Sequence, residues 1–207
     1  MPYKTEQEAF WAGEFGDDYI GRNSSAKLLA SNLAFLAKAL AAAQSLDSCI
    51  EFGANVGMNL QALRLLYPGL EQHAVEINAA AVAELRRFLA PDHVHHASVL
   101  EFAPARTWDL VLIKGVLIHI NPDWLGKVYD ALHAGTGRYL LVCEYYSPTP
   151  QAITYRGHSD RLFKRDFCGE ILARHRDLRL VDYGFAYRGD PKHPQDDITW
   201  FLMEKHG

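Results

Sequence analysis

The chain has 207 residues, of which 49% are hydrophobic and 22% are charged, and 21 Lys and Arg against 25 Asp and Glu give a net charge of −4. This composition excludes a disordered or fibrous protein, and the negative charge disfavours a protein built to hold a long nucleic-acid backbone. The length predicts a single domain, residues 1–207, with a hydrophobic core of its own.

Neither a membrane span nor a secretion signal is expected. No apolar stretch reaches the roughly 18–20 residues that a span needs, and the first ten residues carry three charged side chains where a signal peptide has an apolar core. The three cysteines, Cys49, Cys143 and Cys168, are far apart and form no CxxC motif. We therefore expect a soluble, cytoplasmic protein whose cysteines stay reduced.

Apolar spacing and turn residues predict the elements in chain order. Helices are expected at 25–43, 58–66, 79–89, 121–133 and 165–176, and strands at 48–52, 72–77, 109–114, 139–143, 178–187 and 198–204. Residues 1–45 are expected to form a helical cap, and residues 146–166 a lid or substrate loop without regular structure. The alternation predicts an α/β fold with a mostly parallel sheet, and the two final strands predict an antiparallel terminal strand.

The segment 51–57 (EFGANVG) joins the first expected strand to the next helix. Its glycines accept positive φ and let a ligand approach the backbone, at the carboxyl end of a strand where open α/β sheets bind ligands. The GxxxG spacing is neither the GxGxxG of dinucleotide-binding folds nor a P-loop. A carboxylate at Glu51 suits a cationic ligand, and Glu76, which ends the second strand, can accept both hydroxyls of a ribose.

Glu51, Gly53, Gly57 and Glu76 in this context resemble the cofactor site of class I S-adenosylmethionine (SAM) methyltransferases. The resemblance covers about residues 45–145 and includes WDLVLI at 108–113 and VLIHI at 116–120. It implies a Rossmann-like class I methyltransferase fold, which is a three-layer sandwich around a mostly parallel seven-stranded sheet with an antiparallel terminal strand. It also implies SAM as the cofactor.

Further segments, over nearly the whole chain, look like the methylases associated with pseudaminic acid (nonulosonic sugar) biosynthesis. They are FWAGEFGDDY at 10–19, KGVLIHINP at 114–122, EYYSPTP at 144–150, YRGH at 155–158 and DDITWF at 196–201. This resemblance implies methylation of a small, anionic, sugar-like acceptor, such as a nonulosonic acid or a nucleotide sugar.

The cofactor contacts that the resemblance implies come from strand ends and the turns after them. They are Glu51, Gly53, Asn55, Gly57, Glu76, Ile77, Ser98, Val99, Lys114 and, in the N-terminal segment, Tyr19. Many relatives carry an acid for the adenine amino group after the third strand. This chain has Ser98 there, so Ser98 or a neighbouring backbone group would serve instead.

Four residues are candidates for catalysis: His119, Glu144, Tyr145 and Tyr146. Methyl transfer from a sulfonium is an in-line displacement that depends on positioning, and a hydroxyl or ammonium acceptor also needs a base. His119 is a candidate base, with a histidine bonded to backbone at a helix start as the alternative. Glu144 or a following tyrosine can bind acceptor, take a proton or steady the sulfonium, with core packing as the alternative.

The segment 155–165 is basic, and its candidate substrate-binding residues are Tyr155, Arg156, His158 and Arg165. Guanidinium groups clamp carboxylates and phosphates, although a solvated basic face is the usual explanation of such a run. In the N-terminal segment, the aromatic residues Trp11, Phe15 and Tyr19 either close over the cofactor or pack onto the core.

No metal is expected. His93, His95 and His96 are close in sequence, but adjacent side chains on a strand point to opposite faces, and no acid or cysteine stands at ligand spacing. As partners we expect a small-molecule substrate, no nucleic acid and no membrane, with the chain a monomer or a homodimer.

Two other functions remain open. A protein of this fold can cyclise or eliminate the aminobutyryl arm of SAM and release methylthioadenosine. It can also be a non-catalytic SAM-binding module, because a fold alone does not establish an activity.

Overall fold

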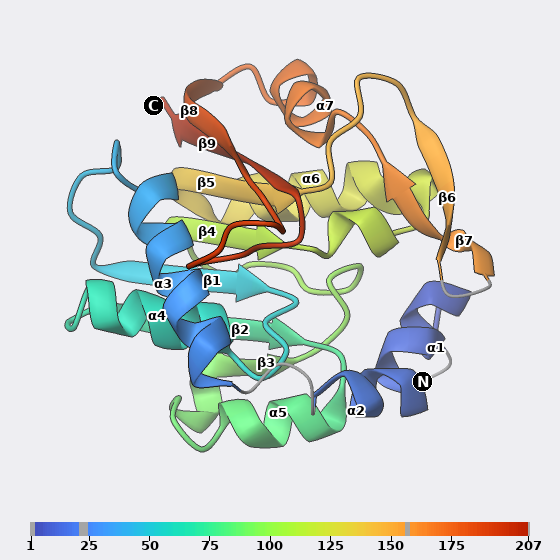
Figure 1. Ribbon diagram of the computed structural model, residues 1–207, viewed down its shortest axis with the longest axis horizontal. Helices are drawn as coiled ribbons and strands as arrows, with labels where there is room; N and C mark the ends of the chain where they lie inside the picture. Colours follow the sequence, from blue (N-terminus) through green and yellow to red (C-terminus); the bar gives the residue numbers. More distant parts are fainter. Residues whose placement is uncertain (1–2, 21–24, 156–157, 207) are drawn as a thin grey trace.

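The computed structural model describes residues 3–20, 25–155 and 158–206, and the side chains of 18–20, 154–155 and 158–161 lie outside this description. Seven strands form one sheet in the order β3-β2-β1-β4-β5-β9-β8 (Figure 1). The strands are β1 Ser48–Phe52, β2 Glu71–Glu76, β3 Val94–His96, β4 Trp108–Lys114, β5 Thr136–Glu144, β8 Leu178–Ala186 and β9 Ile198–Lys205. Neighbouring strands are parallel from β3 to β5, whereas β9 is antiparallel to both β5 and β8. The predicted fold class is therefore confirmed.

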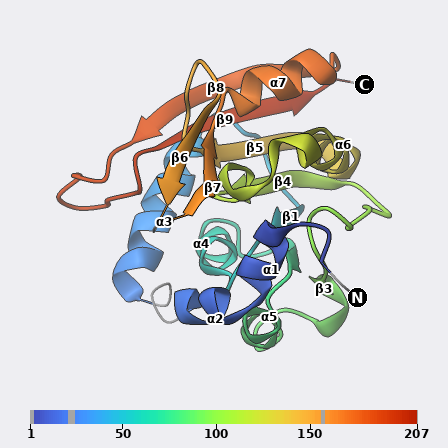
Figure 2. The same cartoon turned by 90° about the vertical axis from the view of Figure 1, so that its right-hand side faces the viewer.

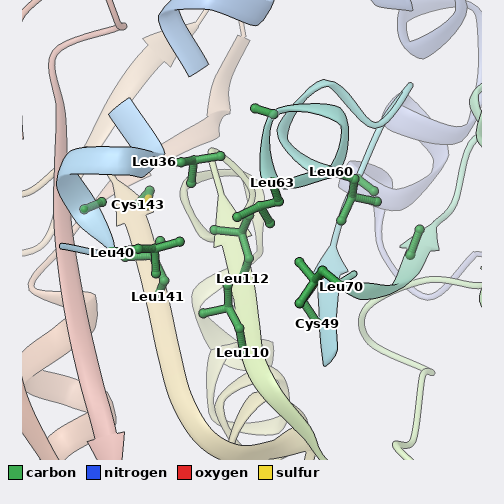
Figure 3. Close-up of a cluster of buried hydrophobic side chains, with 14 of the residues drawn as sticks. Leu36, Leu40, Cys49, Leu60, Leu63, Leu70, Leu110, Leu112, Leu141 and Cys143 are labelled. Carbon is green, nitrogen blue, oxygen red and sulfur yellow. The ribbon is translucent and has the colours of Figure 1, made fainter. Parts of the chain in front are cut away.

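Helices cover both faces of this sheet. The α-helices are α1 Glu6–Ala12, α2 Glu14–Ile20, α3 Ala26–Ala39, α4 Met58–Leu66, α5 Ala79–Leu85, α6 Leu125–Gly135 and α7 Phe167–Arg174, and the short 3-10 helices are η1 Pro91–His93, η2 Leu117–His119 and η3 Pro122–Trp124. One hydrophobic core joins the sheet to α3, α4 and α5 (Figure 3), and a second joins it to α6 and α7. None of the helices in the described residues has the length and apolar character to cross a membrane.

The central strands are apolar without interruption because both of their faces are buried. In β4, Leu110 and Leu112 belong to the core of α3 and α4, while Val111 and Ile113 belong to the core of α6 and α7. All four side chains are fully buried, and each contributes roughly 1.5–3 kcal/mol to stability by leaving water. This anchoring fixes the carboxyl ends of the strands, where the candidate site lies.

Two helix starts show how local sequence sets the element boundaries. The helix expected at 121–133 begins as η3, with Asn121 Oδ1 accepting a hydrogen bond of 3.0 Å from the Asp123 N–H, and continues as α6. The helix expected at 165–176 begins only at Phe167, because Asp166 caps it by accepting a bond of 2.8 Å from the Gly169 N–H.

The segment 146–166 differs from the expected irregular loop. It contains an antiparallel hairpin of β6 Gln151–Tyr155 and β7 His158–Lys164, in which Ile153 lies opposite Leu162. Leu162 is buried, and β7 packs on η2. The paired strands satisfy backbone hydrogen-bonding groups that an irregular loop would leave to water. Figure 1 shows the hairpin at the end of the sheet where α1 also lies.

Candidate functional site

A cavity of about 400 Å³ lies at the carboxyl ends of the parallel strands. Its walls come from the turn after β1, the ends of β2, β4 and β5, the hairpin, the N-terminal helices and the segment before β9. The predicted site residues that line it are Gly53, Asn55, Glu76, Ile77, Ser98, Val99, Lys114, His119, Glu144 and Tyr145. The structure therefore brings most of the predicted cofactor residues and three of the four catalytic candidates into one space.

The turn after β1 has the backbone geometry that its glycines predicted. Gly53, Asn55 and Gly57 have φ values of +75°, +47° and +77°. A Cβ at Gly53 would lie 2.5 Å from Val116, so a side chain there would collide with the loop after β4. Gly57 does not line the cavity; it starts α4 and packs against Phe88, so its glycine serves packing and backbone conformation.

The Glu76 carboxylate is buried at the cavity wall and held by backbone donors. The Asn55 N–H donates to one oxygen at 2.7 Å, and the Asn78 N–H donates to the other at 2.8 Å. Burial raises the pKa of Glu76 above its usual value. Glu76 thus joins the turn after β1 to the start of α5.

Glu51 does not line the cavity. Its Oε1 accepts a hydrogen bond of 2.6 Å from Asn59 Nδ2, and Asn59 is the residue that lines the wall. Burial raises the pKa of Glu51 to about 8, and its Oε2 has no partner among the described residues. The predicted contact between a Glu51 carboxylate and a cationic ligand therefore has Asn59 in between.

Lys114 is the only Lys or Arg among the described residues that line the cavity. Its Nζ lies 5.7 Å from the centre of the Phe35 ring. Its charge opposes the burial effect on both neighbouring acids, since it lowers the pKa of Glu51 and of Glu144. Lys114 therefore supplies positive charge between two acids whose ionised forms are disfavoured.

Glu144 holds the turn that carries His119. Its Oε1 accepts bonds of 2.9 Å from the N–H groups of Val116 and Leu117, and its Oε2 accepts one of 3.4 Å from Ile118. Burial raises the pKa of Glu144 to about 7. With these three backbone donors, the carboxylate acts as the cap of η2 and positions His119 at the end of it.

His119 is buried at the cavity wall, 8% exposed, with its ring 4.7 Å from the ring of Trp11 in α1. The backbone N–H of His119 bonds to the Val116 carbonyl, because His119 is the last residue of η2. The residue lines the cavity, and its role as a base stays a prediction.

Tyr145 and Tyr146 point in different directions, as neighbours in extended chain do. Tyr145 lines the cavity, and Lys164 Nζ lies 5.3 Å from the centre of its ring. Tyr146 does not line it; the side chain is 44% exposed, and its ring lies 6.1 Å from that of Phe201. Tyr146 is thus separated from the other catalytic candidates.

The predicted anion clamp is only partly within the described structure. Arg165 does not line the cavity, and its Nε bonds to Glu170 at 2.7 Å. Arg156 lies outside the described residues, as do the side chains of Tyr155, His158 and the cofactor candidate Tyr19. From the described part of the hairpin, Leu162 is the residue that lines the cavity.

Other wall residues were not predicted. Asn78 joins α2 to α5, since its Nδ2 donates to Asp17 Oδ1 at 2.8 Å, and Figure 2 shows α2 next to α5. Gln195 Nε2 donates to Asn32 Oδ1 at 3.0 Å, and both side chains are buried. Asn78 stands two residues after Glu76 at a helix start, which is a usable signal. Asn32 and Gln195 are too far apart in sequence for any local pattern to pair them.

The sequence spacing around His93 shows no acid at ligand distance, but the fold brings one beside it. Glu71 and His73, from β2, lie beside His93, and one possible ligand atom of each falls within 4.8 Å of the others. Glu71 Oε1, however, already bonds to both His73 Nε2 at 2.7 Å and Arg106 Nη1 at 2.8 Å. The guanidinium at this carboxylate opposes a second cation.

Residues 50–137 match a family model described as a methyltransferase domain. No protein with curated function matches the chain. The matched region contains the glycine turn, Glu76, Ser98 and His119. The match supports a SAM-dependent methyltransferase as the enzyme class and SAM as the cofactor.

Solved methyltransferase structures have the same fold. Mitomycin 7-O-methyltransferase is 15% identical, with a TM-score of 0.65 over 98% of this chain and 61% of its own. Magnesium protoporphyrin IX methyltransferase from Synechocystis, solved with bound SAM, is 11% identical, with a TM-score of 0.67 over all of both chains. An amino pentose methyltransferase from Micromonospora echinaspora is 13% identical, with a TM-score of 0.61 over 93% of this chain and 96% of its own. The chain thus spans about 61% of the mitomycin enzyme, and at these identities the likeness shows the fold.

Proposed function

We propose that this chain transfers the methyl group of SAM to a small, anionic, sugar-like acceptor, a nonulosonic acid or a nucleotide sugar. The observation that carries the proposal is the single cavity in which the glycine turn and Glu76 share walls with Lys114, His119 and Tyr145. A cofactor and an acceptor must meet in one water-poor space for an in-line displacement. The walls come from many elements around a limited volume, which favours a small acceptor over a macromolecule.

In this proposal, the cofactor lies along the ends of β1, β2 and β3. The turn after β1 brings backbone close to it, the Glu76 carboxylate accepts the ribose hydroxyls, and the Ser98 and Val99 region faces the adenine. Ser98 Oγ already accepts the Leu100 N–H at 3.0 Å, so its own hydroxyl hydrogen stays available as a donor. SAM bound there supplies an electrophilic methyl group on a sulfonium.

The acceptor lies on the other side of the cavity, between His119 and Tyr145. With SAM bound, the imidazole of His119 would take the proton from the acceptor oxygen or nitrogen as that atom is methylated. Lys114 favours an anionic acceptor, because burial disfavours the ionised forms of Glu51 and Glu144 and leaves its charge incompletely balanced. The basic segment with Arg156 and His158 remains the proposed clamp for the anionic group.

The sugar assignment depends on the resemblance to the methylases associated with pseudaminic acid biosynthesis. A sugar acceptor is compatible with the fold, since the amino pentose methyltransferase has the same fold. A cytoplasmic location, the lack of a nucleic-acid partner and a monomeric or homodimeric state belong to the same proposal. The described structure has three free, buried cysteines, which suits a reducing compartment.

Product analysis tests the proposal. We expect incubation with SAM and the right nonulosonic acid or nucleotide sugar to give S-adenosylhomocysteine and a methylated acceptor, and SAM alone to give neither. Methylthioadenosine without any acceptor would instead establish cyclisation or elimination of the aminobutyryl arm. SAM binding without either product across a panel of anionic sugars would support a binding module.

A further inference from the structure

Two buried carboxamides meet on one wall of the cavity. Asn32 lies within α3, one turn before the core residues Phe35 and Leu36. Gln195 lies in the chain between β8 and β9, which comes next to α3 (Figure 1). The two residues are 2% and 6% exposed, and both line the cavity. Asparagine is a poor residue for a helix interior, and a buried amide costs stability unless it is bonded, so core packing alone does not account for this pair.

The pair leaves one donor and one acceptor free. Gln195 Nε2 donates to Asn32 Oδ1 at 3.0 Å, while the other two amide atoms, Asn32 Nδ2 and Gln195 Oε1, have no hydrogen-bond partner among the described residues. Neither of these two atoms is sealed from solvent as Glu51 Oε2 is, so both are open to the cavity. Turning both amides over gives the same result, because one NH₂ group and one carbonyl oxygen always remain.

The pair lies on the side of the cavity where the acceptor is proposed to bind. Thr199 of β9 pairs with Glu144 at the end of β5, so the chain before β9 runs past the carboxyl end of β5. Lys114 Nζ also approaches α3, since it lies 5.7 Å from the ring centre of Phe35, one turn after Asn32. In the sheet, β5 and β9 lie on the opposite side of β4 from β1, β2 and β3, along which the cofactor is proposed to bind. The free amide atoms are therefore on the acceptor side.

We propose that Asn32 and Gln195 bind an acylamino group of the acceptor, such as an acetamido group. Asn32 Nδ2 donates to the acyl carbonyl and Gln195 Oε1 accepts the amide N–H, so both free atoms gain partners. Leu28, one turn before Asn32, and Ile198 also line the cavity and offer apolar surface to the acyl chain. A hydroxyl group would satisfy the polar atoms but leave this apolar surface uncovered. A carboxylate has no hydrogen for Gln195 Oε1, and Asp196 on the same wall disfavours its charge.

The chain around Gln195 is held in place before any ligand binds. The Asp197 N–H bonds to the Gln195 carbonyl at 2.9 Å, and Asp197 Oδ1 accepts a bond of 2.9 Å from the Arg188 N–H. Groups that are fixed in advance lose little entropy on binding, so they discriminate well between acceptors. This inference deepens the proposed function and rests on it, because the pair belongs to the cavity in which methyl transfer is proposed.

Calorimetry with two matched pairs of anionic sugars tests the subsite, with S-adenosylhomocysteine present so that binding is measured without turnover. One pair is uridine diphosphate N-acetylglucosamine and uridine diphosphate glucose. The other is N-acetylneuraminic acid and its analogue with a hydroxyl in place of the acetamido group. Within at least one pair, we expect the acetamido member to bind at least about tenfold more tightly, because it makes two hydrogen bonds and buries a methyl group. Equal affinities within both pairs would overturn the proposal.

Asn32→Asp separates recognition from a merely structural link. Its carboxylate still accepts the bond from Gln195 Nε2 but has no hydrogen for the acyl carbonyl, so the preference within the pair should fall to about twofold or less. Gln195→Glu should do the same, because its carboxylate takes up the NH₂ group of Asn32. An unchanged Kd for S-adenosylhomocysteine shows that each variant is folded. A folded variant that keeps the wild-type preference would overturn the proposal.

Asn121→Asp is the matched control. Asn121 also lines the cavity, and an aspartate there adds the same charge while its Oδ1 keeps the bond from the Asp123 N–H. This variant should keep the acetamido preference, and an equal loss in it would attribute the effect to charge and overturn the proposal. A protein that binds S-adenosylhomocysteine but none of the four sugars would contradict the proposed acceptor class together with this inference. Sugars that bind without preference contradict this inference alone.

Discussion

Strand β2 carries a glutamate at each end, and the two have opposite environments. Glu71, at the start, lies among Arg106 and His73, and these partners hold its pKa below the usual value. Glu76, at the end, is buried and bonded to two backbone N–H groups, and burial raises its pKa. The same residue type thus forms a surface ion pair at one end of a strand and part of a cavity wall at the other.

The difference extends to the sheet as a whole. Buried acids with raised pKa values, Glu51, Glu76 and Glu144, gather at the carboxyl end, where backbone or amide groups bond to them. Acids with lowered pKa values, such as Glu71 and Asp177, lie at the amino end beside histidine or arginine. Acids whose ionised form is disfavoured by burial are typical of functional sites, whereas acids paired with a cationic side chain are typical of the protein surface.

Glu76→Ala should have the largest effect. The substitution removes the acceptor for the Asn55 and Asn78 N–H groups, which shape this wall, and it removes the proposed contact with the ribose hydroxyls. Two charge-assisted hydrogen bonds to the ribose are worth about 3 kcal/mol together, which corresponds to about 100-fold in the Kd for SAM. Isothermal titration calorimetry measures the change. The matched control is Glu71→Gln at the other end of β2, which should leave the Kd unchanged. Equal losses in both variants would show that β2 contributes only stability.

Glu51→Gln should change how stability depends on pH. Because the folded-state pKa, about 8, is above that of the unfolded chain, Glu51 stabilises the protein most below pH 4 to 5 and loses that contribution as the pH rises toward 8. The difference in the free energy of unfolding between the uncharged variant and the wild type should therefore change in the variant's favour by about 3 kcal/mol from pH 5 to pH 8.

Urea unfolding at several pH values measures this gain. Glu71→Gln is again the control, since an acid with a lowered pKa loses its contribution only at acid pH. A Glu51→Gln protein whose stability runs parallel to the wild type from pH 5 to 8 would contradict a buried, protonated Glu51.

His119→Gln should lower kcat by about 10–100-fold, because the variant lacks a base for the acceptor proton. The Kd for SAM should stay within about threefold, since the proposed cofactor contacts come from other strands. Single-turnover measurements of S-adenosylhomocysteine formation separate the effect on the methyl-transfer rate from the effect on the Kd for SAM. His96→Gln, an exposed residue that does not line the cavity, is the control and should keep full activity. A normal kcat in His119→Gln would remove His119 as the base.

The fold and the part of the cavity proposed to hold the cofactor follow from local patterns. The buried strands are continuous apolar runs, and β1 and α4 have the expected boundaries because Gly57 starts the helix. Glycine at 53 and 57 also predicts the left-handed turn that the structure contains. These features depend on residues that are neighbours in sequence.

The remainder depends on contacts between distant segments. That Glu144 caps η2 follows from the pairing of β4 and β5, which no spacing within a segment predicts. That Asn59 separates Glu51 from the cavity follows from how the start of α4 packs beside β1. Sequence spacing likewise does not predict Glu71 beside His93, because the parallel pairing of β2 and β3 brings it there. Local pattern identifies the strand ends, whereas packing decides which of their side chains reach the ligand.

The smallest expected effect separates two neighbouring tyrosines. Tyr145→Phe should raise the KM for the acceptor about threefold, the effect of one hydroxyl worth below about 1 kcal/mol, whereas Tyr146→Phe should leave it unchanged. Steady-state kinetics with a saturating SAM concentration compares them. Only Tyr145 lines the cavity, while Tyr146 lies against Phe201 on the exposed face. If Tyr146→Phe raises the KM and Tyr145→Phe does not, the acceptor binds on the Phe201 side, outside the cavity that His119 lines, and the proposed role of His119 as its base is wrong.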